Sequence, residues 1–110
     1  MSWDVHIGHR ERNITFNFSP LFRTMMPGGL SQLHGVTAEE AATIIWHGFK
    51  SASHINEDGE HVMSFITRVG TSSNALTRGS NTIEQGLSVL RELWQVCIEA
   101  NPAEKVLVFG

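Results

Sequence analysis

The sequence predicts an α+β fold in one domain that covers the whole chain of 110 residues. Polar and apolar residues alternate over residues 3–7 and 13–18, which is the period of a β-strand with two different faces. Apolar stripes with helical spacing follow capping residues at 38–54 and 83–100. Residues 105–109, with an apolar run at 106–109, add a last strand. We therefore expect a small β-sheet, made of an N-terminal hairpin and a C-terminal strand, packed with about three helices.

The composition limits the classes of partner. A hydrophobic content of 41% allows a buried core, and the formal net charge is −3 with a pI near 6.0. The 8 Lys and Arg residues are dispersed among 11 acids, whereas nonspecific nucleic-acid binding requires a basic patch that releases counterions from phosphates. We therefore expect no bulk nucleic-acid binding, while a small patch could still hold one phosphorylated ligand.

The sequence shows no targeting or membrane segment. The first four residues contain neither a basic region nor a long apolar run, and no segment reaches the ~18 apolar residues of a membrane span. With a single cysteine, Cys97, no intrachain disulfide can form. These features predict a cytoplasmic protein that does not contact membranes.

The N-terminal part reads as a hairpin followed by a short helix. Residues 3–7 form a first strand, residues 8–12 a turn and residues 13–18 a second strand. Ser19 is a good N-cap and Pro20 suits a first helical turn, so a helix should follow and run to about residue 26, before a Pro-Gly-Gly stop. The apolar face of the second strand carries Ile14, Phe16 and Phe18.

The middle of the chain predicts one long helix. Residues 30–36 form a connection with Leu33 packed inward, and Thr37 begins a capping box for a helix from residue 38 to about residue 54. A charged turn follows at 56–60, and residues 61–69 fit either a short helix or an extended segment. The helical stripe contains Ala41, Ile44, Ile45, Gly48, Phe49 and Ala52.

The last helix is the clearest element, from residue 83 to residue 100 after a capping box that begins at Thr82. Its apolar face carries Ile83, Leu87, Leu90, Trp94, Cys97 and Ile98, widened by Val89, Leu93 and Val96. The strand predicted at 105–109 contains an unbroken apolar run at 106–109, which suits a strand that is covered on both faces. Gly48 and Gly86 each cost roughly 1 kcal/mol relative to Ala inside a helix, which predicts close helix contacts at both positions.

The best candidate site is the polar face of the predicted strand at 13–18. Its side chains are small and neutral, and lie ~6.5–7 Å apart on one face. Because Asn both donates and accepts hydrogen bonds, such a row can bind ribose hydroxyls or the edge of a base. The alternative is a solvated face of an edge hairpin, although the row contains no Lys or Glu. The row consists of Asn13, Thr15, Asn17 and Ser19.

A second candidate is the segment at 70–81, which combines glycines, three consecutive hydroxyl residues and nearby arginines just before a helix N-terminus. Free N–H groups and the helix dipole favour anions at such a place, so the segment has the parts of a phosphate cradle. The alternative is an ordinary surface loop, since neither a P-loop nor a GxGxxG motif is present. The candidate ligand-binding residues are Asn13, Thr15, Asn17, Ser19, Arg23, Arg68, Thr71, Ser72, Asn74 and Arg78.

No catalytic, metal or cofactor site is predicted. His47 and His54 are two helical turns, or ~10.5 Å, apart, which is too far for one metal ion, and a single cysteine cannot build a Cys/His zinc site. Cys97 lies on the apolar stripe, where a buried thiol is more common than a nucleophile. No carboxylate spacing indicates a paired-acid mechanism, so the sequence favours a binding protein over an enzyme without excluding hydrolysis.

The three tryptophans are candidates for ring stacking or for an interface. Trp94 falls in the stripe of the last helix and is expected in the core. Trp46 falls beside the main stripe of its helix, and Trp3 begins the first strand. The alternative for each is a position at the rim of the core.

Residues 13–22 resemble the opening of a group of small phage and actinobacterial proteins, in which an Asn-x-Thr-x-Asn-x-Ser motif precedes an apolar helix. That group continues with a Leu-x-Gly-like connection, a helix with a Glu-Ala centre, a helix with the pattern Gly-x-x-x-Leu-x-x-Leu-x-x-x-Cys, and a Pro before a final strand. The matching residues here are Leu33, Gly35, Glu40, Ala41, Gly86, Leu90, Leu93, Cys97, Pro102 and 106–108. The resemblance implies a phage-type accessory protein that acts in the cytoplasm of a host bacterium, and it carries no activity.

Two main functions follow as hypotheses. The first is a non-catalytic, homo-oligomeric protein that binds a nucleotide-like small molecule in a deep pocket between subunits, with Asn17 and an arginine reaching into it. By analogy of size and setting, it would be a sponge that sequesters a host immune signal. The second is a protein-binding module that inhibits a host protein or forms a phage accessory part, with Trp3, Trp46, Met25 or Met26 exposed. A small nucleotide hydrolase is a third, weaker possibility.

Overall fold

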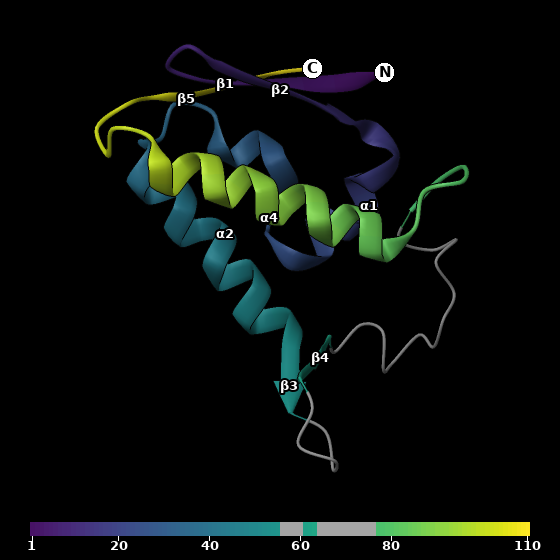
Figure 1. The fold of residues 1–110 in the computed structure, drawn as a ribbon. Helices are drawn as coiled ribbons and strands as arrows, with labels where there is room; N and C mark the ends of the chain where they lie inside the picture. The colour runs from purple at the N-terminus through teal and green to yellow at the C-terminus, as the bar shows by residue number, and fades with distance from the viewer. Residues whose placement is uncertain (56–60, 64–76) are drawn as a thin grey trace.

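A computed structural model describes residues 1–55, 61–63 and 77–110 (Figure 1). The predicted charged turn at 56–60 lies outside the described residues, as do residues 64–69 of the ambiguous segment and 70–76 of the predicted cradle. The elements in chain order are β1 (Ser2–Ile7), β2 (Arg10–Thr15), the 3-10 helix η1 (Phe16–Phe18), α1 (Ser19–Met25), the 3-10 helix η2 (Gly29–Leu33), α2 (Ala38–Ala52), β3 (Ser53–Ile55), β4 (His61–Met63), α4 (Ile83–Glu99) and β5 (Val106–Phe109).

The fold is α+β, as predicted, with an antiparallel sheet in the order β2-β1-β5. The N-terminal hairpin and the C-terminal strand therefore share one sheet, with β1 in the centre. Figure 1 shows this sheet as one layer with α1, α2 and α4 all on the same side of it. The short strands β3 and β4 form a separate antiparallel pair after α2, so residues 61–63 are extended.

The hairpin differs from the prediction in where its second strand lies. Strand β2 covers Arg10–Thr15, not residues 13–18, and Phe16–Phe18 form a 3-10 turn. The Thr15 hydroxyl ends the strand because it accepts a hydrogen bond from the Asn17 N–H at 3.3 Å, and such local side-chain bonds compete with the strand ladder. The apolar alternation at 14, 16 and 18 thus passes from a strand into a turn.

Helix α1 begins one residue earlier than predicted. Phe18 occupies the N-cap position, so the prediction of Ser19 as the cap is wrong. The Ser19 hydroxyl instead donates to the Phe16 carbonyl oxygen at 2.7 Å, while Pro20 stands in the first turn as expected. This turn directs Leu21 and Phe22 into the core, where both are fully buried.

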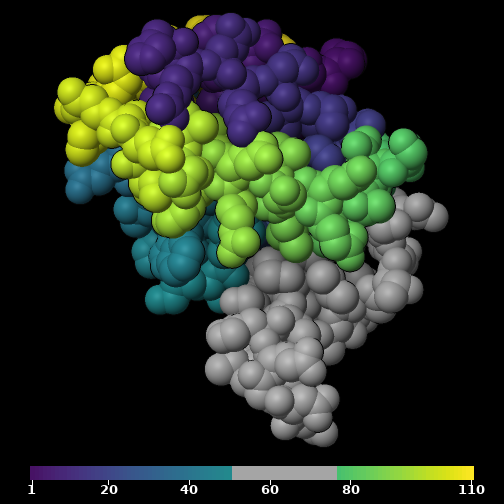
Figure 2. Space-filling model, in the orientation of Figure 1, coloured from purple at the N-terminus to yellow at the C-terminus, as the bar shows by residue number. Residues whose placement is uncertain are grey.

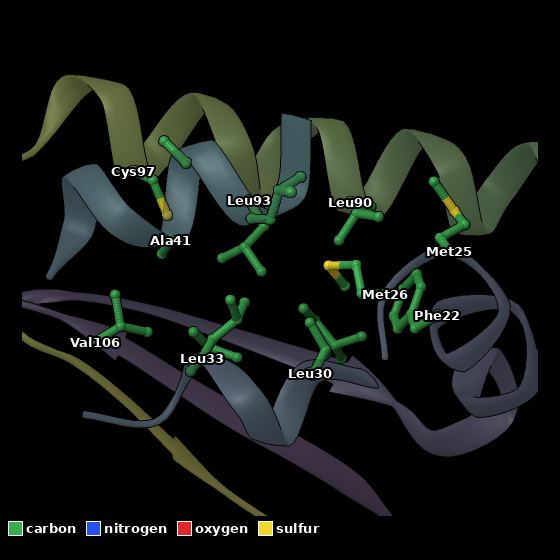
Figure 3. Packing of buried hydrophobic residues seen from close by; sticks show 14 of the residues in the cluster. Phe22, Met25, Met26, Leu30, Leu33, Ala41, Leu90, Leu93, Cys97 and Val106 are labelled. Atoms are coloured by element: carbon green, nitrogen blue, oxygen red, sulfur yellow. The ribbon is translucent and has the colours of Figure 1, made fainter. Parts of the chain in front are cut away.

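The core lies between the sheet and the helices. Figure 3 shows Leu90, Leu93 and Cys97 pointing from α4 toward the layer that contains Leu30 and Leu33 of η2. The inward position predicted for Leu33 is confirmed. The largest fully buried side chains are Phe22, Leu21, Met26, Leu30, Leu33, Ile45, Leu90, Leu93, Val5, Val106 and Cys97.

Both helical glycines lie against α1 or the residues that flank it, which confirms the predicted close contacts. A Cβ atom at Gly86 would lie 2.5 Å from Cδ2 of Leu21 and 3.0 Å from a ring carbon of Phe18. A Cβ atom at Gly48 would lie 2.8 Å from Cγ of Met26. Because the two glycines have no Cβ atom, side chains from one short segment, residues 18–26, pack directly against both long helices.

The two long helices, α2 and α4, begin as predicted, but the face of α4 that is buried differs from the predicted one at Ile98. Thr82 forms both hydrogen bonds of a capping box with Gln85, and the Thr37 hydroxyl accepts from the Glu40 N–H at 3.2 Å. Leu93 lies at the buried centre of α4, whereas Ile98, predicted to face the core, is 48% exposed. Helix α4 is therefore rotated so that one edge of its apolar stripe faces outward.

Strand β5 is covered on one face only, which corrects the prediction of two covered faces. Val106 is buried, but Leu107 and Phe109 are exposed, because every described helix lies on the other side of the sheet (Figure 1). The outer edge of β5 is closed by residues before α2. Val106 N–H donates to the Val36 carbonyl oxygen at 2.8 Å, and Val108 N–H donates to Nδ1 of His34 at 3.0 Å.

Candidate functional site

The predicted polar row is not a row in the folded chain, because the strand ends at Thr15. Asn13 is exposed on the outer face of the sheet and donates through Nδ2 to Ser2 Oγ and Asp4 Oδ1, each at 2.8 Å. The hydroxyls of Thr15 and Ser19 are used in local hydrogen bonds around η1. The four side chains therefore do not present one polar face to a ligand.

The structure does bring Asn17 next to the segment before α4. Asn17 Nδ2 donates to Asn81 Oδ1 at 2.7 Å, and the Arg78 N–H donates to the Asn17 carbonyl oxygen at 3.0 Å. The Arg78 side chain is exposed there, and Arg23 is exposed on α1. Two predicted site residues far apart in sequence, Asn17 and Arg78, thus lie together. The other predicted residues, Arg68, Thr71, Ser72 and Asn74, lie outside the described residues.

The start of α4 has fewer free donors than the cradle prediction assumed. The Thr82 hydroxyl accepts from the Gln85 N–H at 3.2 Å, and the Gln85 side chain accepts from the Thr82 N–H at 2.8 Å. This capping box satisfies two of the backbone groups that an anion would otherwise bind. The anion-binding capacity of this helix terminus is reduced accordingly.

A different feature stands out between α2 and α4, which we call the α2–α4 groove. It is a hollow of about 460 Å³ between the first half of α2 and the last turns of α4. Figure 2 shows α2 and α4 side by side at the surface of the molecule. The groove is lined by Glu39, Ala42, Thr43, Trp46, Trp94, Cys97, Ile98, Ala100 and Pro102.

Small residues on the helices create the space, and large ones flank it. Ala42 and Cys97 are almost completely buried. Trp46 and Ile98 are 50% and 48% exposed, so two of the large apolar side chains that the described chain leaves exposed flank this groove. The Trp46 and Trp94 rings are stacked with centroids 5.5 Å apart, so one half-exposed ring is held in place by a second ring.

The Cys97 side chain lines the groove from below, and its thiol belongs to the packed core and not to a catalytic centre. Burial raises the pKa of Cys97 to about 11, so the side chain is a neutral thiol at physiological pH. A nucleophilic cysteine needs a lowered pKa and access to solvent. The predicted burial of Cys97 is confirmed.

One end of the groove is polar. The Glu39 N–H donates to the Pro102 carbonyl oxygen at 3.3 Å, and the Thr43 hydroxyl donates to the Glu39 carbonyl oxygen at 3.1 Å. The first bond joins the start of α2 to the chain that follows α4, the second lies within α2, and the Glu39 side chain is exposed. The groove thus runs from a carboxylate at one end to two indole rings at the other.

The sequence indicated only part of this groove. Trp46 was recognised as an interface candidate, but Ile98 was placed in the core. Of the other candidates for an exposed apolar patch, Met25 and Met26 are buried and Trp3 is half-buried against the core. A usable signal was present in the pairs Ala42–Trp46 and Trp94–Ile98. Each pair has the i, i+4 spacing of one helix face and lies beside the main buried stripe.

Two other kinds of site are absent from residues 1–55, 61–63 and 77–110. That part of the chain contains no group of three or more His, Cys, Asp or Glu side chains that could hold a metal ion. None of its helices has the length and apolar character needed to cross a bilayer. Comparison of the chain with protein-family models, with curated proteins and with solved structures found no match, so function is inferred from the groove and the surfaces around it.

Proposed function

We propose that this protein is a non-catalytic interaction module that binds a partner protein through the α2–α4 groove. The observation that carries this proposal is the exposure of Trp46 and Ile98 on opposite sides of a hollow floored by small residues. Contiguous exposed apolar surface on a small domain marks interaction sites. Tryptophan is the residue most enriched among those that dominate binding energy at protein interfaces.

The fixed orientation of the rings supports the same conclusion. Because Trp46 is stacked on Trp94, it loses little freedom when a partner covers it, and a preorganised anchor makes binding less costly. The open hollow beside it accepts a side chain from the partner. The surrounding polar atoms of Glu39 and Thr43 give the groove a hydrated rim, which is the usual composition of an interface edge.

The test is a selection from random peptides displayed on filamentous phage, followed by affinity measurements on three forms of the protein. Peptides selected on the wild type should lose at least about tenfold in affinity on Trp46→Ala, as expected for an aromatic anchor. Phe109→Ala is the matched control, because Phe109 is an equally exposed aromatic residue on the sheet, away from the groove. Peptides that bind equally well to Trp46→Ala would contradict the proposal.

A second proposal is that a nucleotide-like small molecule binds near the start of α4, where Asn17 and Arg78 lie together. Asn17 uses its amide N–H in the bond to Asn81, and the exposed Arg78 guanidinium suits a phosphate group. Together with the resemblance to small phage proteins, this supports a homo-oligomeric sponge for a host immune signal in the bacterial cytoplasm. This function is independent of the α2–α4 groove.

A thermal-shift panel of mono-, di- and cyclic nucleotides tests the second proposal, because a ligand that binds only the folded state raises the midpoint. A stabilising nucleotide should lose its effect on Arg78→Ala and keep it on Arg91→Ala, which removes an equally exposed arginine from α4. Heating the complex and analysing what is released then distinguishes a sponge, which returns intact ligand, from a hydrolase. If no nucleotide shifts the midpoint, the second proposal is wrong.

A further inference from the structure

The length of the α2–α4 groove suits one face of a helix. Glu39 and Trp46 line the groove from positions seven residues apart on α2, which is two helical turns, or ~10.5 Å. Side chains at positions i and i+7 of an α-helix have the same spacing, and helices that bind in grooves use anchors at i, i+3, i+4 and i+7. A helix lying along α2 can therefore reach both ends of the groove at once.

The charges around the groove are unevenly compensated. The two salt bridges within the described residues are Arg10–Glu99 at 2.9 Å and Arg12–Glu92 at 2.8 Å, and both join β2 to α4. Glu92 and Glu99 of α4 thus have partners from the sheet and do not line the groove. Glu39, at the polar end of the groove, belongs to neither pair. A cation supplied by a bound partner would compensate this carboxylate.

Resting on the proposed function, we propose that the groove binds a basic amphipathic helix of the partner. One aliphatic side chain of that helix lies over Ala42 and Cys97, against the Trp46 ring. A Lys or Arg two turns away lies beside the Glu39 carboxylate. The apolar contact supplies most of the affinity, because it removes apolar surface from water. The ion pair at the exposed rim selects a helix with positive charge and fixes the direction in which that helix lies along the groove.

The acid at position 39 has an alternative explanation that the test must separate. Acids in the first turn of a helix are stabilising through the helix dipole, whatever binds nearby. Glu40 shares that position in the first turn of α2 and is also exposed, but it does not line the groove. It is therefore the matched control for charge at Glu39.

The experiment measures fluorescence polarisation with three labelled helical peptides of about 14 residues, or about four turns. Each carries the same leucine stripe, and its flanking positions are all Lys, all Gln or all Glu. The Lys peptide should bind the wild type more tightly than the Gln peptide, and the Glu peptide least tightly. Each step should be about two- to fivefold, as for exposed ion pairs. Glu39→Lys should reverse this order, and Glu40→Lys should leave it unchanged.

Three results would overturn the inference. They are equal affinities for the three peptides, an equal response to Glu39→Lys and Glu40→Lys, and a dimer in light scattering that Trp46→Ala dissociates, because a second copy would then occupy the groove. Neither of the first two results contradicts the proposed function, provided that the phage-selected peptides still lose affinity on Trp46→Ala. Far-UV circular dichroism of each variant checks that the total helix content is retained.

Discussion

Helices α2 and α4 have small residues on two different sides, and these residues are tightly covered on one side and left under an open hollow on the other. Toward α1, Gly48 and Gly86 are covered so closely that an added Cβ would lie within 3.0 Å of a neighbouring side-chain atom. Toward solvent, Ala42 and Cys97 lie under a hollow that none of the described elements fills. We call these the inner side and the outer side of the helix pair.

The difference shows that a small side chain only provides space, and that a third element decides how it is used. On the inner side, Leu21 and Met26 fill the space and each contributes roughly 1.5–3 kcal/mol of burial. On the outer side, Trp46 and Ile98 remain half exposed, so part of that gain is still available. The outer side can obtain it only from another molecule.

The strongest test of this comparison is Leu21→Ala. Leu21 is fully buried and contacts Gly86, so its truncation should lower the free energy of unfolding by about 2–5 kcal/mol. Ile98→Ala on the outer side, where the side chain is half exposed, should cost no more than about 1 kcal/mol. Urea unfolding of both variants measures the difference. Equal losses would mean that the outer side is packed as tightly as the inner one.

Gly86→Ala should come next, with a loss of about 1–3 kcal/mol from overpacking. Its new methyl group would lie 2.5 Å from Cδ2 of Leu21 and 3.0 Å from the Phe18 ring. Because the clash involves Leu21, the double variant Leu21→Ala/Gly86→Ala should be more stable than the sum of the single losses predicts. The control is Ser88→Ala, an exposed position on α4 where only helix propensity changes. Strictly additive losses would show that the two residues do not share the contact.

The parts of the fold that were predictable depend on local signals. Thr82 and Gln85 form the predicted capping box, and α2 begins at the predicted residue, because a cap and a stripe are both encoded within a few turns. The end of β2 was not predictable in the same way. The alternation through Phe16 and Phe18 fits a strand, but the Thr15 hydroxyl bonds the Asn17 N–H and makes a turn instead.

The candidate groove was less predictable, because it depends on how α4 is rotated. The apolar residues of α4 form a stripe that extends around more than half of the helix circumference. The sequence therefore does not show that Leu93 faces the core and Ile98 faces solvent. It also does not show which elements cover Ala42 and Cys97. Those facts come from the packing of α2 against α4 and of η2 beneath them.

The pH dependence of stability tests whether the floor of the groove is dry. Burial raises the pKa of Cys97 from its ordinary value of 9.0 to about 11, so the folded state binds the thiol proton more tightly than the unfolded chain. This contribution to stability is complete below the unfolded pKa and is lost as the pH rises from about 9 toward about 11. The loss should be at most about 3 kcal/mol. Cys97→Ala should show a shallower decline over this range, and parallel curves would indicate a hydrated thiol.

The smallest expected effect on stability is also the most direct contrast between the two sides. Ala42→Leu adds volume to a small residue, as Gly86→Ala does, but on the outer side, where the hollow can accept it. The added side chain should leave the free energy of unfolding within about 1 kcal/mol of the wild type, or raise it, because it buries apolar surface of its own. Because the new leucine side chain occupies the position proposed for the partner's aliphatic anchor, it should also lower the affinity of the selected peptides by at least about tenfold. Urea unfolding and fluorescence polarisation on the same sample separate the two effects. A strongly destabilised Ala42→Leu protein would show that the outer side is closed, and an unchanged peptide affinity would place the partner elsewhere.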